Sequence, residues 1–217
     1  MKKNIILMGP PGAGKGTLAT ILRDELHLTH ISTGDMFREA IKIGTPLGKE
    51  AKAYLDSGNL VPDAITIGLV KERLSKDDCQ NGFLLDGFPR TLVQAEALEE
   101  LTKEISRPIE VVINLECDES ELISRISGRR VCPKCGAPYH IKNMRPKVEG
   151  ICDNCGSELY QRPDDNEEAL KVRLQHYVND TKPLLDFYKE KGLLANFDSL
   201  VGIKRLFDEV KNFLAQD

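Results

Sequence analysis

The stretch Gly9-Pro10-Pro11-Gly12-Ala13-Gly14-Lys15-Gly16-Thr17 follows directly on the apolar run 4–8 (NIILM) and precedes a helical pattern at 18–26. Glycines let a backbone turn tightly with its N–H groups pointing inward, a following helix adds its positive end, and a lysine supplies a full charge. The stretch therefore predicts a P-loop that cradles phosphates. A simple P-loop has Ser or Thr directly after the lysine, whereas Gly16 intervenes before Thr17 here. Which hydroxyl reaches a metal ion stays open at this point.

Length and composition fit one α/β domain with insertions. The chain has 217 residues, of which 41% are hydrophobic, and a formal net charge of -4. Neither a basic face nor a polybasic run stands out, which argues against nucleic acid or a membrane surface as a partner. Lys2 and Lys3 precede an apolar run that is too short for a signal peptide, and no run approaches the length of a transmembrane helix. We therefore expect an unexported, cytoplasmic enzyme.

Short apolar runs alternate with helical patterns along the chain, which predicts a parallel sheet covered by helices on both faces. After the first loop, the extended runs lie at 30–32, 82–86, 109–115 and 193–198. The helical patterns lie at about 36–60, with breaks at 44–46 and 57–58, and at about 63–74, 92–105, 119–126, 167–188 and 204–214. Residues 36–60 resemble a small helical insertion, and a small polar residue near Thr33 is expected to cap its start.

Asp86 ends a wholly apolar run and is the first candidate for a metal ligand. Ligands gather at the carboxyl ends of parallel strands, so Asp86 is well placed to hold Mg²⁺, directly or through water. The competing interpretation is a turn aspartate before Gly87. Arg38, in the helical insertion, is either a solvated helix residue or a phosphate ligand.

Four cysteines form two CxxC knuckles, Cys132–Cys135 and Cys152–Cys155, with sixteen residues between them. Two sulfurs from each knuckle fit one tetrahedral Zn²⁺, and four thiolates leave no open coordination position, so the zinc is predicted to be structural. A redox dithiol is the main alternative, because CxxC alone suits thioredoxin-like chemistry, but it leaves the matching pair unexplained. Cys79 and Cys117 are expected to pack as small apolar residues. His140 and His176 are expected to be ordinary polar side chains.

Several motifs together are similar to the adenylate kinase family, and the resemblance covers essentially the whole chain. They are GPPGAGKGT (9–17), ISTGDMFR (31–38), LVPD (60–63), LLDGFPRT (84–91), GRR (128–130) and RPDDNEE (162–168). The closer similarity is to bacterial forms whose lid carries a cysteine knuckle. The resemblance implies a P-loop nucleoside monophosphate kinase fold with a five-stranded parallel sheet flanked by helices. It further implies a core at 1–31, 62–127 and 166–217, an AMP-binding insertion at 32–61 and a zinc-binding lid at 128–165.

The resemblance also implies reversible Mg²⁺-dependent phosphoryl transfer from ATP to AMP, which yields two ADP and controls the adenine nucleotide balance. The attacking atom is already a phosphate oxygen, so positioning and charge neutralisation carry such a reaction without a general base. Planar guanidinium groups match phosphate oxygens. A monomer is expected. The catalytic set implied by the resemblance is Lys15, Asp86, Arg90, Arg125, Arg129, Arg162 and Arg173.

The same resemblance implies a separate set of binding residues for each nucleotide. The ATP set is Gly12, Ala13, Gly14, Lys15, Gly16, Thr17 and Arg129, with Pro138, Tyr139 and Val201 near the base. The AMP set is Thr33, Arg38, Asn59, Leu60, Val61, Gly87, Phe88, Pro89, Arg90, Gln94, Arg162 and Arg173. Asp164 and Asp165 fall at the hinge of the lid, whose closure is expected to exclude water from the reaction.

Three alternatives stay open. The first is a kinase of the same class that prefers UMP, CMP or GTP as partner. The second is a P-loop switch or ATPase, which hydrolyses nucleotide without a monophosphate acceptor. The third is a zinc module that binds nucleic acid or protein, against which the acidic balance and the lack of interleaved aromatic residues speak.

Overall fold

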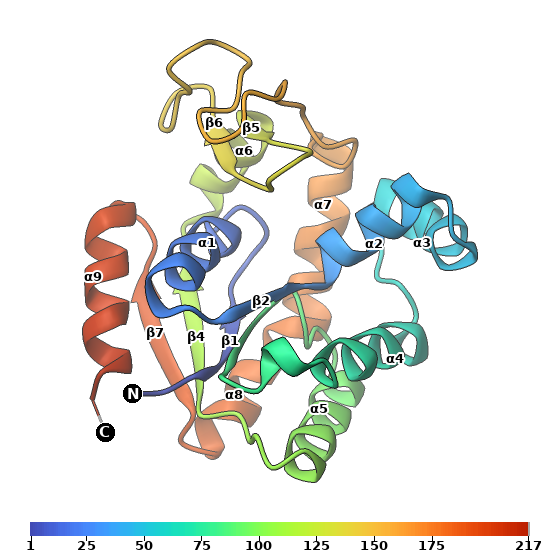
Figure 1. Cartoon of the computed structure of the whole chain (residues 1–217), viewed down its shortest axis with the longest axis vertical. Helices are drawn as coiled ribbons and strands as arrows, with labels where there is room; N and C mark the ends of the chain where they lie inside the picture. The colour runs from blue at the N-terminus through green and yellow to red at the C-terminus, as the bar shows by residue number, and fades with distance from the viewer. Residues whose placement is uncertain (217) are drawn as a thin grey trace.

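Within residues 1–216, which the computed structural model describes, five parallel strands form the centre of the molecule in the order β2-β3-β1-β4-β7 (Figure 1). The order places β1 in the middle of the sheet, where Leu7 pairs with Asp86 on one side and Ile113 on the other. The predicted parallel sheet is thus confirmed. The strands are β1 (Asn4–Met8), β2 (Thr29–Ser32), β3 (Phe83–Asp86), β4 (Val111–Glu116) and β7 (Leu194–Asp198).

The helices lie close to their predicted ranges, with two differences. The first helix begins at Lys15 rather than Leu18, because the end of the P-loop already forms its first turn. The pattern at 167–188 is wrong as one continuous α-helix, because the π-helix η2 (Tyr177–Thr181) interrupts it. The helices are α1 (Lys15–Leu26), α2 (Thr33–Ile43), α3 (Pro46–Asp56), α4 (Asp63–Leu74), η1 (Asp77–Cys79), α5 (Leu92–Glu104), α6 (Glu119–Ser127), α7 (Glu167–His176), α8 (Pro183–Glu190) and α9 (Ile203–Leu214).

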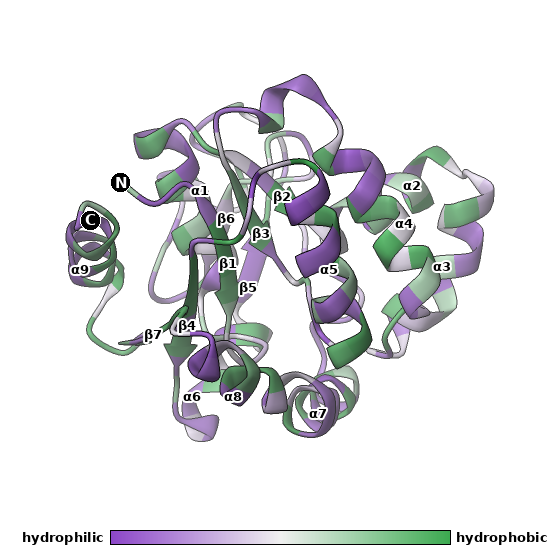
Figure 2. Ribbon diagram, turned by 90° about the horizontal axis from the view of Figure 1, so that it is seen from below, coloured by the Kyte–Doolittle hydropathy of each residue, from purple (hydrophilic) through white to green (hydrophobic). Residues whose placement is uncertain are grey.

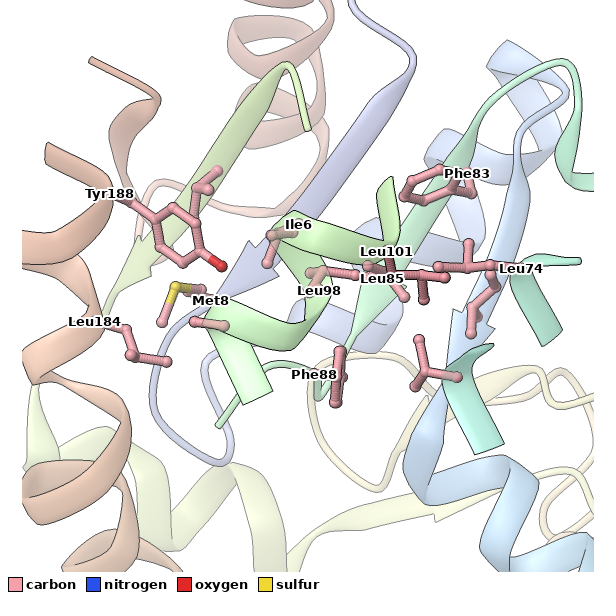
Figure 3. Close-up of a cluster of buried hydrophobic side chains, with 14 of the residues drawn as sticks. Ile6, Met8, Leu74, Phe83, Leu85, Phe88, Leu98, Leu101, Leu184 and Tyr188 are labelled. Carbon is pink, nitrogen blue, oxygen red and sulfur yellow. The ribbon is translucent and has the colours of Figure 1, made fainter. Parts of the chain in front are cut away.

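Helices cover both faces of the sheet, and the alternation along β1 shows why its sequence is apolar throughout. Ile6 and Met8 point to the face covered by α4, α5 and α8, as Figure 3 shows for that cluster. Ile5 and Leu7 point to the opposite face, covered by α1 and α9. A strand buried on both sides needs apolar side chains at every position. In Figure 2 the central strands β1 and β4 are accordingly green, whereas α5 and α7 carry purple, hydrophilic stretches.

Two segments extend beyond this sheet and each has a small apolar cluster. Helices α2 and α3 project to one side in Figure 1 and pack through Phe37, Ala51 and Val61. Ser32 caps α2 by accepting from the backbone N–H of Asp35, which confirms the predicted polar cap. Thr45 caps α3 in the same way.

The second segment, residues 129–165, carries the cysteine knuckles, lies at the top of Figure 1 and is called the cysteine segment below. It contains an antiparallel pair, β5 (Arg129–Val131) and β6 (Pro138–His140), which sequence patterns did not indicate. Such short strands show no usable period-2 pattern. Cys79 is buried in the cluster under α4, α5 and α8, and Cys117 packs partly buried against the cluster on the opposite face of the sheet, so both thiols pack as expected. Among residues 1–216, no helix combines the length and the apolar character needed to cross a membrane.

Candidate active site

A cavity of about 670 Å³ opens at the carboxyl ends of the parallel strands. Its lining includes the last residues of three neighbouring strands, Met8, Ser32 and Asp86, together with the glycine-rich loop. The α2–α3 segment contributes on one side and the cysteine segment on another. The crevice at the carboxyl ends of the strands is where open α/β sheets bind ligands.

The glycine-rich loop has the geometry that its sequence predicts. Gly9, Gly12 and Gly14 all have positive φ, at 137°, 91° and 98°, a region that disfavours other residues. A Cβ on Gly9 would lie 2.6 Å from the carbonyl oxygen of Leu115, so the close approach of the loop to β4 requires glycine there. Gly14 caps α1, which places the positive end of that helix at the cavity.

Lys15 lies partly buried beneath the loop and points its ammonium group at loop carbonyls. Its Nζ donates to the carbonyl oxygens of Gly9 at 2.7 Å and Pro10 at 2.9 Å. Burial lowers the pKa of Lys15 to about 8, although the nearby carboxylate of Asp86 opposes the shift. Lys15 is therefore still charged at neutral pH and can pair with phosphate oxygens.

Asp86 ends β3 beside the loop. Burial by itself would raise its pKa, but the nearby ring of His30, whose Nε2 lies 3.7 Å from a carboxylate oxygen, and the charge of Lys15 lower that pKa. The group is therefore a carboxylate at neutral pH. A carboxylate and the hydroxyl of Thr17 in one cavity are the hard oxygen donors that Mg²⁺ takes, so these residues fit the ion.

Of the seven arginines that line the same cavity, Arg23 pairs with the neighbouring Asp24, and the other six come from distant parts of the chain. Burial lowers the pKa of Arg173 to about 9, with the charges of Arg129 and Arg90 acting in the same direction and Asp164 against it. Such crowding of like charges is costly unless anions lie among them. The site is thus prepared for a polyanion. The six are Arg38, Arg90, Arg125, Arg129, Arg162 and Arg173.

Carboxylates hold several of these guanidinium groups in place. Asp35 accepts from Arg38 at 2.6 Å and from Arg162 at 3.0 Å, which connects α2 to the segment that follows the knuckles. Burial would raise the pKa of Asp35, but these two arginines hold it at about 2. Asp164 pairs with Arg173 at 2.9 Å.

Two others, Arg90 and Arg125, are oriented by backbone carbonyl groups. Arg90 donates from Nε to the carbonyl oxygen of Gly87 at 2.8 Å. Arg125 donates to the carbonyl oxygens of Ala13 and Ser199, at 3.4 and 3.1 Å. Arg125 therefore connects α6 to the P-loop and to the turn after β7. Sequence reasoning missed Ser199, because nothing in the local pattern of that turn marks it.

The residues expected around AMP lie mostly in the cavity. Thr33 donates to the carbonyl oxygen of Gly87 at 2.9 Å. Gln94 is buried, accepts from the backbone N–H of Arg90 at 2.7 Å and donates to Asp63 at 2.8 Å, so one amide hydrogen and one lone pair are left for a base. Phe88 instead packs its ring in the core. Those that line the cavity are Thr33, Arg38, Asn59, Leu60, Val61, Gly87, Pro89, Arg90, Gln94, Arg162 and Arg173.

Asp63 was missed by sequence reasoning as a site residue. It binds the side chains of both Gln94 and Thr91. Its position in the first turn of α4 gave a signal for a helix start and none for this role.

The residues expected around ATP also line the cavity, with the exception of Val201. The loop residues Gly12 to Thr17, Arg129, Pro138 and Tyr139 line the cavity, whereas at the turn after β7 the lining comes from the neighbours of Val201, Leu200 and Gly202. Tyr139 also belongs to the cysteine cluster. Its hydroxyl lies 3.4 Å from the sulfur of Cys152 and accepts from the backbone N–H of Asp153 at 2.8 Å.

The four knuckle sulfurs meet at one point. All lie within 4.8 Å of one another, with Cys132 3.4 Å from Cys155 and Cys135 3.5 Å from Cys152. Four sulfurs at about 2.3 Å from one ion stand about 3.8 Å apart, so the set fits a tetrahedral Zn²⁺. The hydrogen bond from Tyr139 lowers the pKa of Cys152 to about 6, which favours the thiolate that zinc needs. A redox pair would not require all four sulfurs together.

His140 and His176 are not part of this four-sulfur group. The Nε2 of His140 is 3.1 Å from the carbonyl oxygen of Ser124, and the ring of His176 lies between Asp180 and Asn59. They are polar, partly exposed side chains, as predicted.

Comparisons with known proteins agree with this geometry. The family model described as adenylate kinase matches residues 7–193. An adenylate kinase of Bacillus subtilis (strain 168) is 56% identical over 211 residues, which cover 97% of either chain. Those of Geobacillus sp. (strain WCH70) and Clostridium botulinum (strain Hall) are 54% and 52% identical, over 97% and 98% of this chain and 98% and 99% of their own. The chain, with its P-loop, its arginine-lined cavity and its four-cysteine cluster, belongs to the adenylate kinase family.

Proposed function

We propose that the enzyme catalyses Mg²⁺-dependent, reversible phosphoryl transfer from ATP to AMP, giving two ADP, and so helps to control the adenine nucleotide balance. The observation that carries this proposal is the single cavity in which the P-loop and Lys15 face arginines from both the α2 and the cysteine segments. Two nucleotides bring several negative charges into such a site. The family and its curated relatives support adenine nucleotides as the substrates.

The donor phosphates would lie on the P-loop. Backbone N–H groups at the start of α1 and the ammonium of Lys15 would bind their oxygens. Asp86 and Thr17 would hold Mg²⁺, which neutralises phosphate charge when bound. The base of ATP would lie near Pro138, Tyr139 and the turn after β7.

The acceptor would lie between α2 and the turn after β3. Arg38 and Arg90 would bind the phosphate of AMP, while Thr33, Gln94 and the backbone at 59–61 would contact its base. The acceptor oxygen is an ionised phosphate oxygen, so no residue needs to remove a proton. The chain instead orients two anions in line.

Four further arginines would stabilise the charge on the phosphoryl group during transfer: Arg125, Arg129, Arg162 and Arg173. A positioned arginine is worth about 10³ to 10⁵ in rate in related phosphoryl transfers. Arg129 and Arg162 lie in the cysteine segment, and Arg173 pairs with Asp164, which also lies there. The positions of these three arginines therefore depend on where that segment lies. Closure of the segment would exclude water and so prevent hydrolysis of ATP.

The same proposal divides the chain into a core (1–31, 62–127 and 166–217), an AMP-binding insertion (32–61) and a zinc-binding lid (128–165). Zinc would stabilise a lid whose apolar cluster, around Cys132, Ala137, Tyr139 and Cys152, is too small to do so alone. One chain supplies the whole site, which supports a monomer. Four thiolates favour a reducing compartment, which supports the cytoplasm.

A coupled assay with a panel of nucleoside monophosphates tests the proposal. With Mg-ATP as donor, ADP should form fastest with AMP, and UMP, CMP and GMP should be poor acceptors. Faster turnover with another monophosphate would overturn the choice of substrate. Turnover of ATP that does not depend on any monophosphate would indicate an ATPase.

A further inference from the structure

His176 joins two parts of the chain that lie far apart in sequence. It ends α7, and its Nδ1 lies 2.7 Å from a carboxylate oxygen of Asp180 in η2. Its Nε2 lies 3.1 Å from the side-chain oxygen of Asn59, which follows α3. We call Asn59, His176 and Asp180 the histidine latch.

The neighbours of Asn59 decide which way its amide faces. Its Nδ2 donates to the hydroxyl of Ser57 at 2.8 Å, and that hydroxyl in turn donates to the carbonyl oxygen of Ala53 at 2.8 Å. The amide oxygen therefore faces the histidine ring. Both ring nitrogens thus lie within hydrogen-bond distance of side-chain oxygens, so the ring bridges Asn59 and Asp180.

Gly58, next to Asn59, makes a second close contact with α7. A Cβ on Gly58 would lie 2.6 Å from the carbonyl oxygen of Ala169 and 3.1 Å from the side chain of Arg173. The φ of Gly58 is 78°, so glycine is required here both by backbone conformation and by space. The segment at 57–59 therefore packs on α7 through its backbone as well as through the latch.

The π-helix that carries Asp180 also contacts the other side of the proposed AMP site. The hydroxyl of Thr181 donates to the carbonyl oxygen of Arg90 at 2.9 Å. Of two adjacent residues, Asp180 thus connects through His176 to Asn59, and Thr181 connects directly to the turn after β3. π-helical turns within longer helices are frequent at functional sites.

We propose that His176 is a positioning residue, which through Asn59 holds the AMP-binding insertion against α7 in the arrangement that binds AMP. This inference rests on the proposed function. If the arrangement is populated by only a fraction of free molecules, the apparent affinity for AMP falls by that fraction. Losing the latch should therefore weaken AMP binding and leave ATP binding alone, since the latch contacts no part of the P-loop. The side chain of His176 is 33% exposed, so the effect should be modest.

Steady-state kinetics of the holoenzyme with His176→Ala test this. The KM for AMP should rise about three- to tenfold, while the KM for ATP changes less than about twofold. Asp180→Asn should raise the KM for AMP in the same direction by less, because the ring can still donate to Asn59. The matched control is Glu167→Gln, which breaks the exposed pair with Lys171 on the same helix without touching the insertion, and should change neither KM.

A double-mutant cycle separates the latch from general packing. In an Asn59→Ala background, His176→Ala should cause no further rise in the KM for AMP, because its partner is already gone. An equal rise in both backgrounds would overturn the role of Asn59. An unchanged KM for AMP in His176→Ala, or equal rises for AMP and ATP, would overturn the proposal.

Hydrogen exchange on the ligand-free protein decides the point independently of activity. The amides of residues 57–61 should exchange faster in His176→Ala than in the wild type, and those of α9 should not. Unchanged exchange at 57–61 would refute the latch even in an active kinase. Faster exchange there in a protein that makes no ADP from ATP and AMP would uphold the contact and refute the proposed function instead.

Discussion

Arg129 and Asp165 form a buried, two-pronged ion pair at the two ends of the cysteine segment. The Nε of Arg129 donates to one carboxylate oxygen at 2.9 Å, and its Nη2 donates to the other. The side chain of Asp165 is fully buried and that of Arg129 is 22% exposed. Burial by itself would lower the pKa of Arg129, but the hydrogen bond and charge of Asp165 raise it. The pair therefore fixes the base of the segment.

Asp165→Asn should destabilise the protein by about 2–4 kcal/mol, because it leaves the Arg129 charge buried without a counter-charge. For a chain of this size, such a loss lowers the melting temperature by roughly 4–16 °C. Thermal unfolding measures it. Glu158→Gln, at an exposed acid in the same segment, is the control and should leave melting unchanged. Equal melting temperatures for Asp165→Asn and the wild type would show that the pair contributes nothing to stability.

Cys132→Ser should remove zinc and lower the melting temperature more than it disturbs AMP affinity. A thiolate is lost from a closed set of four, and these cysteines are not among the residues that line the cavity proposed to bind AMP. Metal analysis, thermal unfolding and calorimetric titration with AMP on one preparation measure the three effects. Zinc retained at full stoichiometry together with unchanged melting would contradict a structural four-cysteine site. A chelator should act on the wild type in the same direction.

Arg90→Lys should lower kcat/KM for AMP by roughly 10² to 10³, because an ammonium cannot match the planar fork that the guanidinium offers to phosphate. Arg90 is held by the carbonyl of Gly87, so its direction is fixed before substrate arrives. Arg205→Lys, on the outer face of α9 with a 71% exposed side chain, is the matched control. Similar kinetics in both variants would exclude Arg90 from the site.

ATP affinity should fall as the pH rises through about 8. The pKa of Lys15 is lowered to about 8 by burial, so its ammonium is present below that pH and is lost above it. Phosphate binding depends on the charged form. Calorimetric titration with ATP from pH 6.5 to 9.5 measures the decline, and in Lys15→Arg, whose guanidinium stays protonated, the profile should be flat over this range. A flat profile in the wild type would remove Lys15 from phosphate binding.

Sequence predicted the features that depend on local pattern. The P-loop follows from its glycines and Lys15, and the parallel sheet follows from apolar runs such as 4–8 that alternate with helices. The cysteine cluster follows from spacing, since two knuckles supply the four ligands that zinc takes. The nucleotide residues came from the family resemblance, and their roles are still predictions.

Features that depend on contacts between residues far apart in the chain could not be predicted from the sequence. The pairing of Arg129 with Asp165 and the contact of His176 with Asn59 need the folded chain to bring them together. The π-helix η2 could not be predicted from helical periodicity, because over five residues its wider turn hardly changes the spacing of apolar residues. Phe88 was expected at the AMP site, yet its ring packs in the core, since a motif fixes the backbone path more firmly than the direction of each side chain.

The central claim is that one cavity binds two nucleotides and passes a phosphoryl group between them. The most direct test is to incubate the purified protein with Mg-ATP, with and without AMP, and to quantify ATP, ADP, AMP and inorganic phosphate over time. The account predicts two ADP formed for each ATP and AMP consumed, no inorganic phosphate, and no turnover without AMP. Release of inorganic phosphate from ATP at the same rate with or without AMP would contradict it.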